Sequence, residues 1–169
     1  LPGNSWYGSF INQGTGLFDI KNDVGMNRQY GSEFFNNAGT VRKSAGNGTS
    51  TIATTFNNTG TVDVQTGTLN LTGGGSHSGA FTGSPGATLQ FGGGTHALSN
   101  TSSVSAATVR FAGSNTTTTN IDGTYDVTAS TTVANGTVTF SSQTSLVSIG
   151  SALEITPLSS GTVNCNCSA

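Results

Sequence analysis

Short stretches in which apolar and polar residues alternate recur along the whole chain. Val62 and Val64, for example, alternate with polar residues on either side. Because successive side chains of a strand point to opposite faces, each stretch predicts a short β-strand with one buried and one solvated face. Gly, Asn and Ser separate the stretches, and these residues suit tight turns. The pattern therefore predicts an all-β fold with many short strands.

One repeated motif consists of Phe, three further residues, Gly and Thr. It begins at Phe10, Phe35 and Phe56, and a looser copy with one extra residue begins at Phe81. The steps between these phenylalanines are 25, 21 and 25 residues. Repetition at intervals of this size is typical of solenoids, in which each repeat is one supersecondary unit.

A second motif has a more regular interval. Residues 67–71, 87–91 and 107–111 match one another at steps of 20, and the glycine-rich segments 73–77 and 92–96 match at a step of 19. Less regular copies of the strand unit follow at residues 123–127, 136–140 and 151–155. A circuit of three strands and three turns needs about 20 to 25 residues, which matches these intervals.

The repeats predict a right-handed parallel β-helix, or β-solenoid, with seven or eight rungs of about 20–25 residues. Equivalent positions would stack about 4.8 Å apart. Five columns follow directly from the motifs: Leu69, Leu89 and Val109; Leu71, Phe91 and Phe111; Phe35 and Phe56; Asn36 and Asn57; and Asn37 and Asn58. The alternative is an antiparallel β-sandwich, which also has many short strands. Only stacked rungs favour like residues every 20 positions.

We expect one domain, residues 1–169, with regular repeats over about 10–119 and looser rungs over 120–169. The segments 35–41, 56–62 and 67–96 resemble repeats of large bacterial secreted and surface proteins, namely filamentous-haemagglutinin-like and autotransporter-like adhesins. The resemblance implies extracellular display on a β-helix, and it transfers no catalytic residues, because the matching motifs are structural.

Charge excludes some partners. Only 7% of residues are charged and the net charge is −2, so the chain has no basic excess with which to bind nucleic acid. No apolar window is long enough to span a membrane as a helix. Because 33% of residues are hydrophobic and occur in regular bursts, the composition is also unlike that of a disordered chain.

The carboxylates form no catalytic arrangement that the sequence reveals. Asp122 with Asp126, and Asp19 with Asp23, are the closest pairs, and i and i+4 positions on a strand lie about 13 Å apart. His77 and His96 are expected on adjacent rungs, without a visible third ligand for a metal. We therefore predict a chain that is not an enzyme, with no catalytic, cofactor-binding or metal-binding residues.

The sequence is compatible with two kinds of covalent modification, disulfide formation and glycosylation. Cys165 and Cys167 are either unmodified thiols or form a disulfide, within the pair or as a joint to another subunit. Asparagines in Asn-x-Ser/Thr sequons, which are candidates for glycosylation, occur at Asn47, Asn57, Asn70, Asn100, Asn115, Asn135 and Asn166.

Neither terminal segment reads as an amphipathic helix that would cap a solenoid. We expect either end-to-end self-association or continuation in a longer chain. The predicted function is an extracellular or cell-surface structural or adhesive β-solenoid, either a head-to-tail filament subunit or an excerpt of a giant surface protein, with surface glycans as candidate partners. The alternative is a carbohydrate-binding or carbohydrate-cleaving β-helix.

Overall fold

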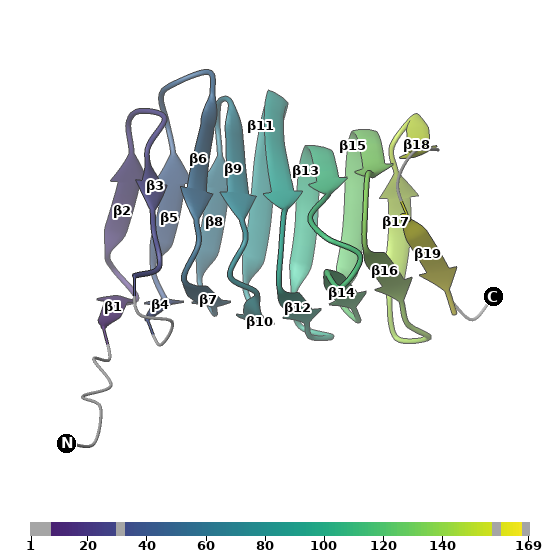
Figure 1. Cartoon of the computed structure of the whole chain (residues 1–169), viewed down its shortest axis with the longest axis horizontal. Helices are drawn as coiled ribbons and strands as arrows, with labels where there is room; N and C mark the ends of the chain where they lie inside the picture. The colour runs from purple at the N-terminus through teal and green to yellow at the C-terminus, as the bar shows by residue number, and fades with distance from the viewer. Residues whose placement is uncertain (1–7, 30–32, 157–159, 167–169) are drawn as a thin grey trace.

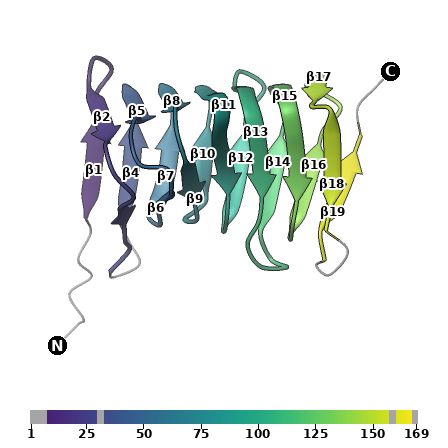
Figure 2. The same cartoon turned by 90° about the horizontal axis from the view of Figure 1, so that it is seen from above.

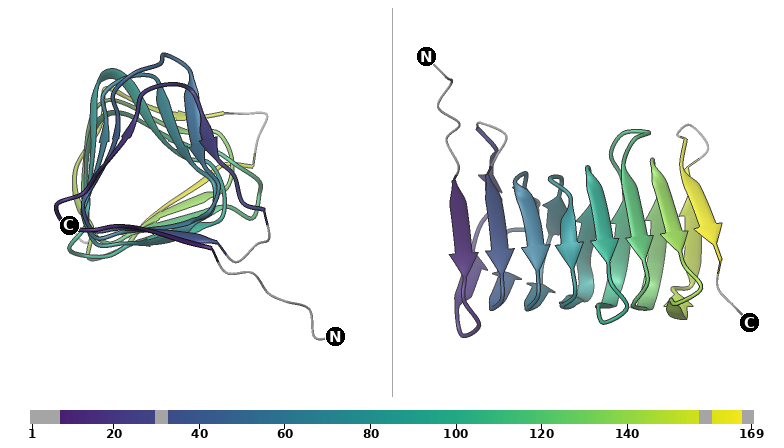
Figure 3. Two further views of the ribbon diagram at one scale, coloured as in Figure 1. Left: turned by 90° about the vertical axis from the view of Figure 1, so that its left-hand side faces the viewer. Right: turned by 90° about the horizontal axis from the view of Figure 1, so that it is seen from below.

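The computed structural model describes residues 8–29, 33–156 and 160–166. All strands pair in parallel and stack into a β-solenoid of about seven turns, which confirms the predicted fold class (Figures 1 and 2). Viewed along its axis the solenoid is a triangular tube with parallel strands on each of its three faces (Figure 3). At about 4.8 Å per turn, seven turns give a rod about 34 Å long.

Face A is the separate eight-stranded sheet. Its strands, in spatial order, are β1 (Ser9–Asn12), β4 (Phe34–Asn37), β7 (Thr55–Asn58), β10 (Gly75–His77), β12 (Thr95–Leu98), β14 (Thr118–Ile121), β16 (Thr137–Phe140) and β19 (Thr162–Cys165). Because spatial order follows chain order, each turn of the solenoid adds one strand to this face.

Faces B and C together form the second sheet. Face B contains β2 (Leu17–Ile20), β5 (Thr40–Lys43), β8 (Thr61–Val64), the first parts of β11 (Ala80–Phe91), β13 (Ser103–Phe111) and β15 (Thr124–Val133), and β17 (Ser145–Ile149). Face C contains β3 (Gly25–Met26), β6 (Thr49–Ile52), β9 (Thr68–Leu71), the second parts of the same three long strands, and β18 (Ala152–Ile155). The long strands bend from face B to face C where their register shifts.

The core is a set of inward columns in which each side chain packs on its counterpart in the next turn. Leu89 pairs with Leu69 and Val109, and Phe91 pairs with Leu71 and Phe111, as the motifs predicted. All six side chains are buried. Each contributes about 1.5–3 kcal/mol by leaving water, so the repeat itself builds the core.

An inward amide ladder occupies face A at the N-terminal end of the rod. Asn12 Nδ2 donates to Asn37 Oδ1 at 2.8 Å, and Asn37 Nδ2 donates to Asn58 Oδ1 at 2.7 Å. The same amides also donate to the backbone, Asn37 to the carbonyl oxygens of Gly39 and Thr61. Stacked asparagines can therefore be buried without an unmet hydrogen-bonding requirement.

The predicted stack of Phe35 on Phe56 is confirmed, but not every phenylalanine of the first motif joins it. Phe10, Phe35 and Phe56 do stack on face A, but Phe81 pairs with Val62 on face B. The glycine-rich segment explains the difference. The pairing of His77 with Asn58 places Gly75 opposite Phe56, where φ is +145° and a Cβ would collide with the carbonyl oxygen of Phe56. The backbone is too close there for any side chain.

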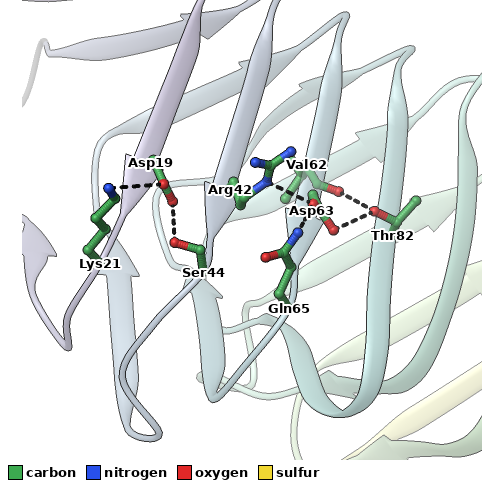
Figure 4. A network of polar contacts seen from close by, with 8 residues as sticks. All are labelled: Asp19, Lys21, Arg42, Ser44, Val62, Asp63, Gln65 and Thr82. Atoms are coloured by element: carbon green, nitrogen blue, oxygen red, sulfur yellow. Dashed lines mark hydrogen bonds and ion pairs between the residues drawn. The ribbon is translucent and has the colours of Figure 1, made fainter.

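Charged residues form cross-turn pairs on the outside of face B (Figure 4). Arg42 Nε donates to Asp63 Oδ2 at 3.1 Å, and Ser44 Oγ donates to Asp19 Oδ1 at 2.6 Å. Asp63 also accepts from Gln65 and Thr82. Because the pairs are partly exposed, each contributes at most about 1 kcal/mol, and their main effect is to fix which strands are neighbours.

Lys43 is the one charged side chain at an inward position that the described residues contain. It is fully buried, and its Nζ donates to Asp23 Oδ1 at 2.8 Å and to the carbonyl oxygen of Ala45 at 3.0 Å. The hydrogen bond from Lys43, followed by one from the Gly48 amide, lowers the pKa of Asp23. The turn that holds Asp23 is thereby tied to the next turn of the rod.

We expect the substitution Asn37→Ala to lower the free energy of unfolding by about 3 kcal/mol, because it leaves buried partners on both neighbouring turns unsatisfied. The matched control is Asn36→Ala, which removes the outward acceptor of the Asn57 amide and should cost under about 1 kcal/mol. Urea titrations followed by circular dichroism measure both. Equal losses would show that the inward ladder has no special role.

Candidate functional site

A recess of about 380 Å³ lies on the outside of face A, near the middle of the rod. One row of outward positions crosses β7, β10, β12 and β14 at this point, and a second row directly follows the ends of these strands. The first row is Asn57, Ser76, Ala97 and Asn120, and the second is Thr59, Ser78, Ser99 and Asp122. The two middle strands carry only small side chains, so the larger residues of β7 and β14 form its walls.

The wall on the β14 side and the floor carry polar groups that the rest of the protein does not use. Within the described part of the chain, the Asp122 carboxylate, the Asn120 amide and the Ser78 hydroxyl have no side-chain hydrogen bond. The wall on the β7 side is more constrained, because Asn57 Oδ1 accepts from the Ser76 amide and Asn57 Nδ2 donates to Asn36. No sequence motif indicates this site, since its residues come from four different turns.

His77 and His96 lie in the interior directly beneath this region. They are on adjacent turns, as expected, but they are not in register: His77 pairs with Leu98, and His96 pairs with Gly75. The true step is therefore 21 residues, and the glycine-rich segments do not superimpose as their sequences suggest. The space left by Gly75 lets the two rings stack, with centroids 5.3 Å apart.

The hydrogen bonds assign the tautomers of the pair. His96 Nε2 lies 2.9 Å from the Gly93 carbonyl oxygen, so it must carry the proton. His96 Nδ1 then accepts from His77 Nε2 at 3.0 Å. His77 Nδ1 is left buried without a partner. Both rings are therefore neutral, and they are enclosed by the rings of Phe81 and Phe91.

Burial lowers both pKa values. It is the main cause for His77, whose pKa falls to about 3, with repulsion from His96 as a second cause. It also lowers the pKa of His96, to about 4, against the opposing effect of hydrogen bonds to the carbonyls of Gly93 and Leu71. Among the described residues, no group of three His, Cys, Asp or Glu is placed to hold a metal ion.

The carboxylate pairs considered from the sequence are separated by the fold. Asp122 lines the recess on face A, whereas Asp126 pairs with Ser105 on face B. The Asp19 carboxylate accepts a hydrogen bond from Ser44, and the Asp23 carboxylate accepts one from Lys43. Each therefore joins its own turn to the next at a different place. None of these pairs converges on a common cleft.

Cys165 occupies an inward position on β19, in the column of Phe140, and is exposed at the C-terminal end of the rod. Cys167 lies outside the described residues. A disulfide within the pair or across a subunit joint therefore remains a prediction.

The sequons fall into two groups by accessibility. Asn47, Asn100, Asn115 and Asn166 are exposed. Asn57, Asn70 and Asn135 are half-buried, and the amides of Asn57 and Asn135 donate to Asn36 and to the Gly113 carbonyl. Glycosylation remains untested at every one, and the exposed group offers the better acceptors.

Apolar side chains at inward positions are uncovered at the two ends of the described rod. At the N-terminal end Phe10 and Val24 are exposed, the latter by 52%. A hollow of about 240 Å³ opens there between β2, β3 and β6, lined by Phe18, Val24, Met26 and their neighbours. At the C-terminal end Leu146, Leu153 and Ile155 are exposed, the last by 49%.

Comparison with known proteins gives no match: no family model, no curated protein and no solved structure is similar to this chain. The adhesin-like resemblance of the repeats thus remains a hypothesis, while the β-solenoid itself is established by the strand pairing. In the described residues, no helix is long and apolar enough to cross a membrane.

We expect the histidine pair to make the rod sensitive to acid. Unfolding frees two histidines that take up protons near pH 6.5, whereas the folded pair stays neutral down to about pH 4. The contribution of the neutral histidine pair to the free energy of unfolding is therefore intact above pH 6.5. It is lost as the pH falls, by up to about 1.4 kcal/mol per pH unit for each ring.

Urea midpoints measured from about pH 7 to about pH 5 test this dependence. His77→Asn removes one titrating ring and keeps a residue that this column already carries at Asn58, so its pH slope should be about half that of the original chain. A pH slope equal to that of the original chain would contradict the assignment of the acid sensitivity to the histidine pair.

Proposed function

We propose that this chain is a structural element of an extracellular or cell-surface protein, a rod lengthened by further turns at its ends. The observation that carries the proposal is the exposure of inward apolar columns at both ends of the described rod. An open strand edge with an apolar column beside it is a template for adding strands. Solenoids normally cover such surfaces with a cap or with another turn.

A second copy of the chain fits each end strand by strand. Stacked head to tail, β19, β17 and β18 of one copy would lie against β1, β2 and β3 of the next, because they belong to faces A, B and C in that order. On face C, Leu153 would continue the column of Val24 and Ile155 that of Met26. Both exposed side chains would then enter the N-terminal hollow.

The charges of the two ends are complementary. Residues 8–44 contain four basic and three acidic side chains, a net charge of +1, whereas residues 112–166 contain Asp122, Asp126 and Glu154 and no basic residue, a net charge of −3. Head-to-tail contact brings these ends together and avoids like-charge contact. A contact of this kind does not close on itself and generates filaments.

The extracellular and adhesive parts of the proposal have indirect support. Surface charge that would keep strand edges apart is scarce, and hydroxyl and amide side chains dominate the outward positions. The resemblance of the repeats to bacterial adhesins points the same way. Outside the ends, the three faces offer a long surface with few charges on which other molecules could be displayed or bound.

End-to-end stacking predicts a distinctive result when two blocked variants are mixed. Val24→Asp places a charge in the N-terminal hollow, and Leu153→Asp places one in the facing C-terminal column. Each variant alone should be monomeric, whereas their equimolar mixture should form dimers and nothing larger, because only one pair of intact ends remains. Light scattering coupled to size exclusion measures this, and the original chain should form filaments repeating at about 34 Å.

Ala152→Asp is the matched control, because Ala152 points outward on the same strand as Leu153. It should assemble like the original chain. If the original chain stays monomeric at high concentration, or if both blocked variants still assemble, the ends are not an interface between copies.

A further inference from the structure

We infer that the recess on face A binds a single sugar residue of an uncharged glycan. This site is separate from the rod ends, and the inference does not depend on stacking. It rests on the shape of the recess and on the polar groups of its walls.

The recess has the dimensions of one sugar ring. Its walls, β7 and β14, are separated by three strand spacings, or about 14 Å between backbones, and its two rows lie about 7 Å apart along the strands. Side chains on both walls reduce the free width to that of a small ring. The floor is formed by the Ala97 methyl group with serines around it, which suits the C–H face of a sugar.

The wall on β14 provides hydrogen-bonding groups suited to neighbouring hydroxyls. A carboxylate accepts two hydrogen bonds and an amide both donates and accepts, so Asp122 and Asn120 can bind adjacent hydroxyls of one ring. Ser78 adds a hydroxyl from the floor. In contrast, the carboxylates of Asp19, Asp23 and Asp63 are all occupied by bonds within the protein.

Other classes of ligand fit less well. No Lys or Arg lines the recess, which disfavours phosphate, sulfate and nucleic acid. Asp122 is its only carboxylate, too few for a bound calcium ion, which takes six to eight oxygen ligands. An extended peptide would need a free strand edge, but β10 and β12 are paired on both sides.

We would test the site by NMR titration with methyl glycosides of glucose, galactose and mannose and with N-acetylglucosamine. The Leu153→Asp chain suits this experiment, because it should be monomeric and its substitution lies far along the rod from the recess. We expect at least one sugar to shift the Ala97 methyl and Asn120 side-chain amide signals saturably, with a dissociation constant on the order of millimolar.

Two variants and one control identify the site. Asp122→Ala should weaken binding at least about tenfold, which corresponds to one lost charge-assisted hydrogen bond. Ala97→Gln should abolish it by filling the floor while keeping a polar outward residue. Asp126→Ala removes a carboxylate from face B and should leave the titration unchanged.

The absence of saturable shifts with all four sugars would overturn the inference. Equal binding by the Ala97→Gln chain would also overturn it, because the sugar would then lie elsewhere. A response to calcium chloride alone would assign the recess to a cation instead. None of these results bears on stacking, which the mixing experiment tests independently.

Discussion

The structure depends on one constraint: each residue must be compatible with the residue at the same position about 4.8 Å away in the next turn. Leu, Val and Phe meet it by packing on their own kind, as in the column of Leu69, Leu89 and Val109. Asparagine meets it inside the tube because an amide can donate to its copy. On the outside, Arg42 meets it by lying next to Asp63.

The same constraint explains how much the sequence could predict. Where successive turns have the same length, the spacing of a motif in the sequence equals the number of residues in a turn. The columns through Leu89 and Phe91 could therefore be predicted directly from the sequence. Where a turn changes length, the two steps differ. Phe81 therefore pairs with Val62 and not with the phenylalanines of its motif, and His77 pairs with Leu98 although its motif matches that of His96. For these two residues the change occurs at Gly73–Gly75, where a backbone approach too close for a Cβ shifts the strand, and no residue pattern predicts such an approach.

The recess could not be predicted from the sequence for another reason. It exists because Ser76, Ser78, Ala97 and Ser99 are small, and small residues are common throughout this chain. Only their position between Asn57 on one wall and Asn120 and Asp122 on the other gives the hollow a shape. Likewise, the buried position of Lys43 follows from its register with Val64, not from any local preference of lysine.

The direction of the backbone hydrogen bonds determines how the rod responds to mechanical force. In each sheet these bonds run from turn to turn, so they lie along the long axis of the rod. Tension between the two ends therefore acts on the turns in series, so that they open one at a time and not all together. Turns span 19 to 25 residues, so each one that opens releases roughly 65–85 Å of extended chain. Such a rod can lengthen stepwise under a pull and keep its remaining turns folded.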